Sequence, residues 1–232
     1  MRILGIIPAR GGSKGIPGKN IKMLAGKPLL EYTWEVASKS KQLSKVILST
    51  EDDAIIKVGN ALGITIPFKR PSSLSEDKSP TLGVIQHALE FYKAKGEVFD
   101  AVCLLQVTSP FRTVAFLDKA IETFIQAKTD ALVSVLEVPH EFNPHWTFKA
   151  NENNELQIAT GEKQIISRRQ DLPKTYHRDG SIYLTKIDVI LKGNSLFGDS
   201  ISYVVSNRET HVNIDTIEDW EKAETICKTK FL

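Results

Sequence analysis

Residues 1–20 read MRILGIIPAR GGSKGIPGKN, and they carry the clearest indication of the type of fold. Residues 3–7 form a short, continuous apolar run bounded by Pro8 and by glycines, which predicts a central strand buried on both faces. Residues 8–20 follow this strand directly and are rich in glycine, lysine and arginine. In an open parallel sheet, ligands bind outside the carboxyl ends of the strands. We therefore predict that residues 8–20 form a ligand-binding loop at the edge of such a sheet.

The rest of the chain repeats the alternation that this first strand begins. Further strands are predicted where continuous apolar runs recur, at residues 45–48, 100–106, 131–138, 181–184 and 201–205. Helices are predicted where apolar residues follow helical spacing, at residues 29–37, 82–92, 116–124 and 216–228. Strands that alternate with amphipathic helices predict an α/β fold, with a mostly parallel sheet covered by helices on both faces.

Two of the predicted helices have recognisable start signals. Ser79 is predicted as the N-cap of the helix at 82–92, with Pro80 at its first helical position. Thr113 is predicted as the N-cap of the helix at 116–124.

Residues 139–172 interrupt the alternation. Residues 139–169 are richer in proline, asparagine, glutamine and histidine, with short apolar pieces only at 146–148 and 156–158. This pattern predicts an extended, hairpin-like insertion with little burial potential of its own, so we expect it to pack on another subunit.

Composition limits the class of protein. The chain has 232 residues, of which 41% are apolar and 25% charged, which is typical of one main globular domain. The net charge of +2 is too near neutral to suggest a nucleic-acid partner, and no apolar run is long enough for a membrane or signal segment. With only two cysteines, the chain is expected in a reducing compartment, the cytoplasm.

The loop at residues 8–20 has the chemistry of a phosphate-binding site. Six cations, at positions 2, 10, 14, 19, 22 and 27, precede the first acid, Glu31. The glycines at 11, 12, 15 and 18 allow backbone N–H groups to approach phosphate oxygens, and Arg10, Lys14 and Lys19 add charged donors. The spacing fits neither GxxxxGK[ST] nor GxGxxG, so the loop alone names no nucleotide. A flexible basic surface turn is the alternative interpretation.

Six motifs in order make the comparison specific: PARGGSKGIPGKN (8–20), KRPSSL (69–74), LLQVTSPFRT (104–113), RRQDLP (168–173), RDGSIY (178–183) and NIDT (213–216). Together they resemble the motif set of the acylneuraminate cytidylyltransferases, also called CMP-sialic acid synthetases, over nearly the whole chain. The resemblance implies a single cytidylyltransferase domain (1–232) with a Rossmann-like sheet and a small inserted dimerisation arm (139–172). It also implies a homodimer, CTP as a substrate and Mg²⁺ as the cofactor.

The resemblance assigns the nucleotide and the catalytic groups by motif. Lys19, Arg10 and Asp215 would be catalytic, with Lys19 stabilising charge at the α-phosphate. The nucleotide-binding residues would be Arg10, Gly11, Gly12, Ser13, Lys14, Lys19, Asn20, Arg70 and Thr81. Thr81 is equally well interpreted as an ordinary residue in the first turn of its helix.

The same resemblance assigns the sugar-binding residues as Gln106, Arg169, Tyr183 and Phe197. Arg169 would reach the site of the neighbouring subunit, where a guanidinium suits a sugar carboxylate. From the residues alone, Tyr183 and Phe197 would be core aromatics. Leu196 stands where some relatives have a second Phe, and Ser109 fits either the site or a turn with Pro110.

Asp215 is the candidate Mg²⁺ ligand, since Mg²⁺ is usually held by one or two carboxylates and by substrate phosphates. Asp215 and Glu218 also fit a capping box that opens the last helix. Members of the family commonly carry a second Asp where this chain has Asn213. The acids at 51–53 are predicted as helix-start acids, although a glycosyltransferase would use them to bind metal.

The implied activity is the conversion of CTP and a sialic-acid-like nine-carbon 2-keto sugar acid, an N-acylneuraminate or a legionaminate, to the CMP-sugar and pyrophosphate. No side chain stands out as a general base. The alternatives are a 3-deoxy-manno-octulosonate or a pseudaminate cytidylyltransferase, a sugar-nucleotide-dependent glycosyltransferase, and a non-catalytic nucleotide-binding module. The segments RRQDLP and RDGSIY favour the sialic acid branch over the octulosonate enzyme.

Overall fold

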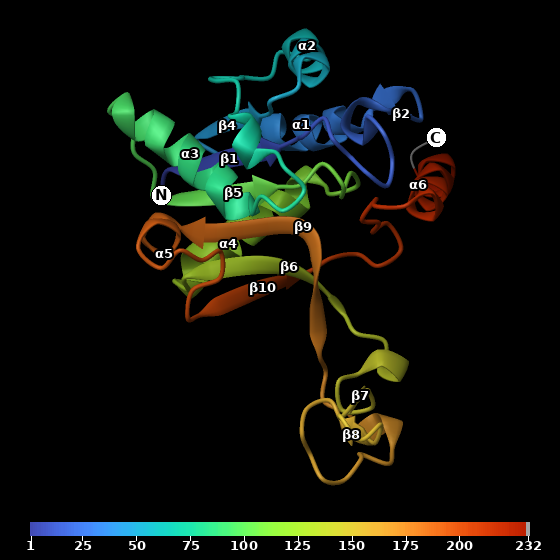
Figure 1. The fold of residues 1–232 in the computed structure, drawn as a ribbon. Helices are drawn as coiled ribbons and strands as arrows, with labels where there is room; N and C mark the ends of the chain where they lie inside the picture. The colour runs from blue at the N-terminus through green and yellow to red at the C-terminus, as the bar shows by residue number, and fades with distance from the viewer. Residues whose placement is uncertain (231–232) are drawn as a thin grey trace.

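The protein is described by a computed structural model, which covers residues 1–230. Its centre is a six-stranded sheet with the order β10-β6-β9-β5-β1-β4 (Figure 1). The strands are β1 (Ile3–Pro8), β4 (Lys45–Ser49), β5 (Ala101–Leu105), β6 (Ala131–Glu137), β9 (Tyr176–Lys186) and β10 (Ile201–Val205). β1 pairs in parallel with β4 and β5, and β10 pairs in parallel with β6. Only β9 runs antiparallel to its neighbours. The predicted mostly parallel α/β fold is confirmed.

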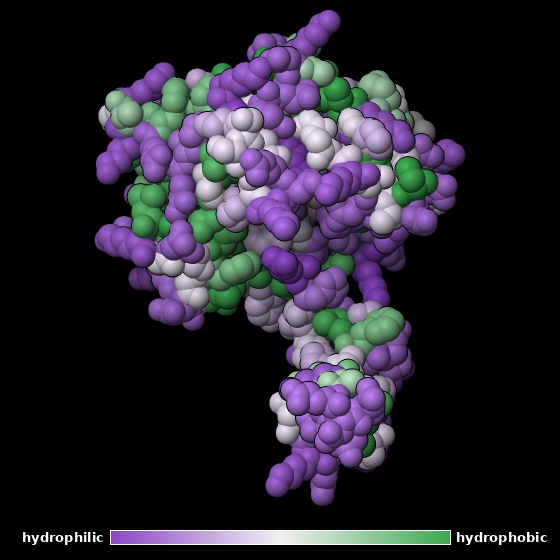
Figure 2. Space-filling view, in the orientation of Figure 1, coloured by the Kyte–Doolittle hydropathy of each residue, from purple (hydrophilic) through white to green (hydrophobic). Residues whose placement is uncertain are grey.

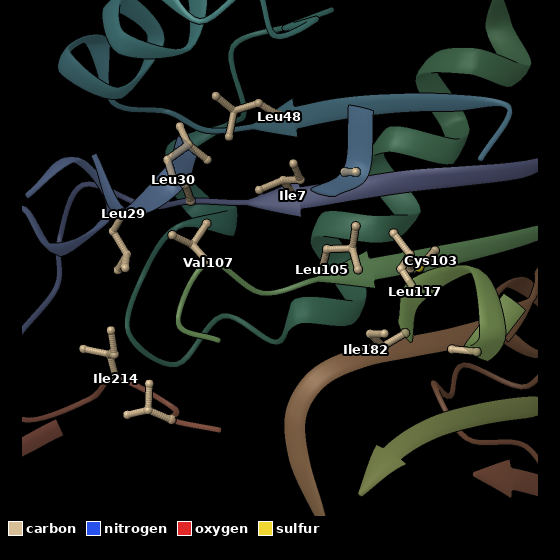
Figure 3. Close-up of a cluster of buried hydrophobic side chains, with 14 of the residues drawn as sticks. Ile7, Leu29, Leu30, Leu48, Cys103, Leu105, Val107, Leu117, Ile182 and Ile214 are labelled. Atoms are coloured by element: carbon tan, nitrogen blue, oxygen red, sulfur yellow. The ribbon is translucent and has the colours of Figure 1, made fainter. Parts of the chain in front are cut away.

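Helices cover both faces of this sheet because each central strand is apolar on both sides. The helices are α1 (Leu29–Lys39), α2 (Asp53–Ala61), α3 (Thr81–Ala94), α4 (Val114–Ala127), α5 (Ile187–Leu191) and α6 (Ile217–Lys230). On β1, Ile3 and Ile7 face a core shared with α1, α4 and α6 (Figure 3), whereas Leu4 and Ile6 face a core shared with α3 and α5. This alternation explains the continuous apolar run, since successive side chains of a strand point to opposite faces.

One predicted helix start is confirmed and another is wrong. Thr113 caps α4, and its hydroxyl accepts a hydrogen bond from the Phe116 N–H at 3.1 Å. Pro80, predicted at the first helical position, has an extended backbone and is itself the N-cap, so α3 begins at Thr81. The Ser79 hydroxyl instead donates to the Ser73 carbonyl at 2.7 Å, within the preceding loop.

The insertion forms an arm that projects from the sheet at the end of β6 and returns in β9 (Figure 1). At its centre β7 (Phe148–Ala150) and β8 (Leu156–Ile158) form an antiparallel hairpin, as the apolar pieces predicted. Short 3-10 helices flank it at His140–Phe142 (η3) and Arg169–Asp171 (η4). A smaller two-stranded sheet, β2 (Met23–Leu24) with β3 (Lys27–Pro28), follows the glycine-rich loop and the 3-10 helix Lys19–Ile21 (η1). None of the helices between residues 1 and 230 is long and apolar enough to cross a membrane.

Candidate functional site

A cleft of about 340 Å³ lies at the carboxyl ends of β1 and β5, where the sequence predicts it. Its walls include eight residues that the motifs single out: Arg10, Ser13, Lys19, Asn20, Arg70, Thr81, Gln106 and Asp215. Gly11, Gly12 and Lys14 belong to the same loop but are outside this lining. The chain therefore brings proposed nucleotide residues of two motifs, Thr81, the sugar residue Gln106 and the candidate metal ligand into one cleft.

Lys19 is a buried cation of this cleft, as is Arg70. Lys19 Nζ donates to the Ile214 carbonyl at 2.5 Å and to Asp215 Oδ1 at 3.0 Å. The loop approaches the same segment at Gly15, where a Cβ would lie 2.1 Å from the Asp215 carbonyl oxygen, so only glycine fits there. Two contacts far apart in sequence thus fix the Lys19 ammonium at the cleft wall.

Arg10 and Lys14 share one carboxylate. Asp77 lies 3.2 Å from Arg10 Nη1 and 2.5 Å from Lys14 Nζ. The hydrogen bond from Lys14 holds the pKa of Asp77 below its usual range. Because the Lys14 side chain is 81% exposed, this pairing is an exchangeable surface contact. A triphosphate entering the cleft would compete with Asp77 for both cations.

Glu51 is a functional candidate that the sequence analysis missed. Asp52 caps α2 by accepting from the Ile55 N–H at 2.9 Å, which confirms its predicted role. Glu51 instead accepts from the Gly11 N–H at 2.8 Å and from Arg70 Nη2 at 2.6 Å. Burial alone would raise the pKa of Glu51, but these hydrogen bonds hold it below its usual value. Its position before the N-cap, at the end of a strand, was the available signal.

Glu51 therefore joins the glycine-rich loop to the buried Arg70. Arg70 Nε also donates to Ser75 Oγ at 2.9 Å. Asn20 adds a second brace, since its Nδ2 donates to the Arg10 carbonyl at 2.9 Å. The Gly11 N–H already donates to Glu51. The Glu51 carboxylate and the Asn20 amide therefore hold the glycine-rich loop in place.

A second pocket, of about 370 Å³, adjoins the cleft. Gln106 lines both, so it marks the junction between them. Tyr183 is buried in the wall of this second pocket, and burial raises the pKa of its hydroxyl. Phe197 packs edge-on against Tyr183, with the ring centroids 6.3 Å apart. Gln106 and Tyr183 thus meet in one pocket, with Phe197 packed against Tyr183.

An irregularity between β6 and β9 shapes this second pocket. The pairing shifts register between Val133 and Val135 of β6. Ser134 fills the gap, because its hydroxyl accepts from the Ile182 N–H and donates to Asp179 at 2.5 Å. Asp179 also accepts from the Ser181 N–H at 2.9 Å and from the Ser206 hydroxyl. This buried network explains why β9 extends beyond the predicted 181–184.

Arg112 supports the junction from behind. Its guanidinium is buried and donates to Ser181 Oγ at 3.2 Å, to Thr33 Oγ1 at 3.0 Å and to the Gln106 carbonyl. Burial lowers the pKa of Arg112 to about 10, so the side chain remains charged at neutral pH. Arg112 therefore holds the backbone of Gln106, and Asp179 and Arg112 are structural residues of the site.

Asp215 faces the cleft instead of capping the last helix. The predicted capping box of Asp215 and Glu218 is wrong, because Thr216 and Asp219 form it one residue later. Asp219 accepts from the Thr216 N–H at 2.9 Å, and Thr216 Oγ1 accepts from the Asp219 N–H at 3.3 Å. The Asp215 carboxylate is 63% exposed, with one oxygen bound by Lys19 and the other by Asn213 Nδ2 at 2.9 Å. No group of three potential metal-binding side chains occurs in residues 1–230.

Arg169 lies apart from these two pockets within one chain. It belongs to η4 on the arm and lines a separate pocket at the base of the arm with Thr175 and Arg208. Its neighbour Arg168 is exposed and pairs with Asp171 at 2.7 Å, as expected for a solvated basic residue. The chain alone does not bring Arg169 to Gln106 and Tyr183.

Comparison with known proteins adds four findings. Residues 4–232 match the cytidylyltransferase family. The pseudaminic acid cytidylyltransferase of Campylobacter jejuni is 38% identical over 228 residues, which cover 98% of this chain and 97% of that one. The CMP-N,N'-diacetyllegionaminic acid synthase of Legionella pneumophila is 31% identical, with the same coverage of each chain. A solved CMP:2-keto-3-deoxy-manno-octonic acid synthetase complexed with CTP shares the fold over the whole of both chains, with a TM-score of 0.74 and 16% identity.

Proposed function

The chain belongs to the cytidylyltransferase family, and from this premise we propose that it transfers CMP from CTP to a nine-carbon 2-keto sugar acid, releasing pyrophosphate. The observation that carries the proposal is the position of Gln106, which lines both the cationic cleft and the adjoining pocket. A transferase needs two substrates held side by side, and this junction provides that arrangement.

The reaction is an in-line displacement at the α-phosphate of CTP. The anomeric oxygen of the sugar forms the new bond to the α-phosphorus and its proton passes to water. The bond from the α-phosphorus to the bridging oxygen breaks, and pyrophosphate leaves with that electron pair. Lys19 stabilises negative charge that develops around the α-phosphate, because its ammonium is fixed before the reaction. Arg10 binds the outer phosphates after exchange with Asp77.

The donor set of the cleft fits Mg²⁺ bound mainly through substrate phosphates. Asp215 offers an exposed carboxylate at the cleft wall, and Mg²⁺ characteristically takes one or two such ligands. Asp215 would hold the ion, which when bound neutralises phosphate charge. Asn213 orients the Asp215 carboxylate through its amide hydrogen.

The arm supports the proposal of a homodimer. On the hairpin, Phe148, Ala150, Leu156 and Ile158 occupy one face, and Lys149 and Gln157 occupy the other. Leu156 is 68% exposed in the single chain. A second copy that covers this apolar face would also bring its Arg169 toward the neighbouring site, where it would assist sugar binding. Cys103 and Cys227 are free thiols, in keeping with a cytoplasmic enzyme.

Among the candidate acids we propose pseudaminate first, followed by a legionaminate and an N-acylneuraminate. The relative named for pseudaminic acid is 38% identical to this chain, against 31% for the legionaminic acid synthase. The contacts of residues 51–53 argue against a glycosyltransferase metal site. Glu51 holds Gly11 and Arg70, Asp52 caps α2, and Asp53 pairs with Lys69 at 2.6 Å.

The test is pyrophosphate release from a matrix of substrates. Each of CTP, UTP, ATP and GTP is combined with pseudaminic acid, N,N'-diacetyllegionaminic acid, N-acetylneuraminic acid or 2-keto-3-deoxy-manno-octonic acid, in the presence of Mg²⁺. We expect release with CTP only, and only with a nine-carbon acid. Pyrophosphate release with UTP or ATP in place of CTP would overturn the proposal. The absence of release with every acid would also overturn it.

A further inference from the structure

The cations of the two pockets differ in how they are neutralised. In the nucleotide cleft, Arg10 pairs with Asp77, Lys19 with Asp215 and Arg70 with Glu51. The second pocket is lined by one arginine, Arg178, which lies at the exposed start of β9. Among residues 1–230, no carboxylate lies within ion-pair distance of its guanidinium. The adjacent Asp179 is buried and directed into its own network of serine hydroxyls. The second pocket therefore presents an unpaired positive charge.

The lining of this pocket also presents hydrogen-bond acceptors, on Gln106 and Asn213. A Cβ added at Gly180 would lie 3.5 Å from both Gln106 Oε1 and Asn213 Oδ1, so the two amide oxygens flank the bare face of Gly180. Asn213 Nδ2 donates to Asp215, which turns Asn213 Oδ1 away from that carboxylate. Asn213 Oδ1 is shielded from solvent and has no hydrogen-bond partner among residues 1–230. Two such oxygens favour a hydroxyl or N–H group and repel a carboxylate.

The chemistry of the proposed acceptor matches this polarity. In the ring form of a 2-keto sugar acid, one carbon carries both the carboxylate and the anomeric hydroxyl. We propose that Arg178 of the same chain binds the sugar carboxylate, which turns the anomeric hydroxyl toward Gln106 and the nucleotide cleft. This inference rests on the proposed function and adds the residue that recognises the acid group.

Neighbouring side chains support Arg178 in this role. The Arg178 guanidinium lies near the Tyr183 hydroxyl, where its charge opposes the rise that burial causes in the pKa of that hydroxyl, and the Tyr183 ring packs against Phe197. A guanidinium without an acid partner keeps its N–H groups for a bidentate carboxylate. Arg169 of a second copy is then a supplementary contact, and the first carboxylate ligand comes from the chain that also supplies Lys19 and Gln106.

Arg178→Gln tests the inference through the steady-state kinetics of pyrophosphate release. The assay uses CTP with pseudaminic acid, or with the acid that the substrate matrix selects. We expect the KM for the acid to rise about 30-fold, the loss typical of a charge-assisted pair, while the KM for CTP stays within about twofold. Arg178→Lys should recover part of this loss, because it restores charge without the planar fork. Arg208→Gln removes an exposed arginine outside both pockets and should match the unsubstituted protein.

The methyl ester of the same acid separates charge recognition from a structural effect. The unsubstituted protein should use the ester poorly, and Arg178→Gln should use it about equally poorly, because the charge that Arg178 binds is absent. An unchanged KM for the acid in Arg178→Gln, or a rise for Arg169→Gln alone, would overturn the inference. If the unsubstituted protein releases no pyrophosphate with any acid, the proposed function itself fails.

Discussion

The nucleotide cleft and the arm differ in whether their side chains find partners within one chain. In the cleft, Lys19 and Arg70 are buried, and each pairs with an acid of the same chain. On the arm, the hairpin turns Phe148 and Leu156 to the surface, and both side chains are exposed. Figure 2 shows the arm projecting from the body, with hydrophobic side chains gathered near its base and a mostly hydrophilic tip.

This difference indicates which parts of the protein are complete in one chain. The cleft holds its cations in place before a substrate arrives, so its function depends on internal pairs. The arm leaves apolar area uncovered, which is typical of a surface that a partner buries. We therefore expect substitutions in the cleft to act on chemistry, and substitutions on the arm to act through assembly.

The largest expected effect is that of Lys19→Ala. Removing the fixed ammonium from the α-phosphate should lower kcat/KM by about 10³-fold, as for other groups that stabilise transition-state charge. The measurement is the rate of pyrophosphate release over a range of CTP concentrations up to saturation, together with the thermal unfolding temperature and the oligomeric state. The protein should stay folded.

Lys69→Ala is the matched control for this change. Lys69 is a surface lysine that also pairs with one acid, Asp53, so its removal should leave kcat/KM unchanged. A turnover rate within about threefold of the unsubstituted value in Lys19→Ala would remove the phosphate role of Lys19. The internal pairs of the cleft would then serve stability alone.

The next effect in size concerns the arm. Leu156→Lys places a charge on the exposed apolar face of the hairpin, where it costs little in a monomer but opposes burial by a partner. We expect a shift from dimer to monomer in sedimentation and a fall of about 30-fold in kcat/KM, because the contact of Arg169 with the neighbouring site would be lost.

Gln157→Lys adds the same charge on the opposite face of β8 and is the control. It should leave both the mass and the rate unchanged. A monomeric Leu156→Lys protein with full activity would show that one chain is sufficient for catalysis. The arm would then serve assembly only, and the cleft alone would carry the activity.

The sequence alone predicts the sheet well, because its signal is local. The apolar runs of β1, β4, β5 and β10 are short, continuous and bounded by turn residues, so their ends fall within one or two residues of the prediction. β9 is different, since its first half is held by Ser134 and Asp179 across an irregular pairing. Contacts between residues so far apart in sequence have no local pattern.

The functional site likewise has a part that the sequence predicts and a part that it does not. Motifs name Lys19, Gln106 and Asp215, and the parallel sheet brings them together at one edge. The contacts that hold the glycine-rich loop, such as those of Glu51 with Gly11 and Arg70, join residues from three separate loops. Position relative to a helix start predicts residues 51–53 as helix-start acids, which is correct for Asp52, the N-cap of α2, and for Asp53 in its first turn, but does not describe Glu51.

Glu51→Gln gives the smallest of the three effects and tests whether the cleft is braced electrostatically. The folded protein holds the pKa of Glu51 below its ordinary value of 4.5, so the ionised carboxylate stabilises the fold above that pH. This stabilisation is lost as the pH falls below 4.5 and through the pKa of the folded state. Gln can still accept from the Gly11 N–H but leaves the buried Arg70 without its counter-charge. At pH 7 the free energy of unfolding should therefore fall by about 1.5 kcal/mol.

Urea denaturation of both proteins from pH 7 to pH 3 separates this brace from simple packing. The difference in free energy of unfolding between Glu51→Gln and the unsubstituted protein should shrink toward zero as Glu51 becomes protonated, because a protonated carboxyl and an amide then carry the same charge. Asp53→Asn removes a surface carboxylate that is 83% exposed, and its difference should stay small at every pH. A loss in Glu51→Gln that is the same at pH 3 as at pH 7 would assign Glu51 a steric role. The side chains of the cleft would then be held in place by packing, as those of the core are. The cleft would then differ from the arm in burial and not in paired charge.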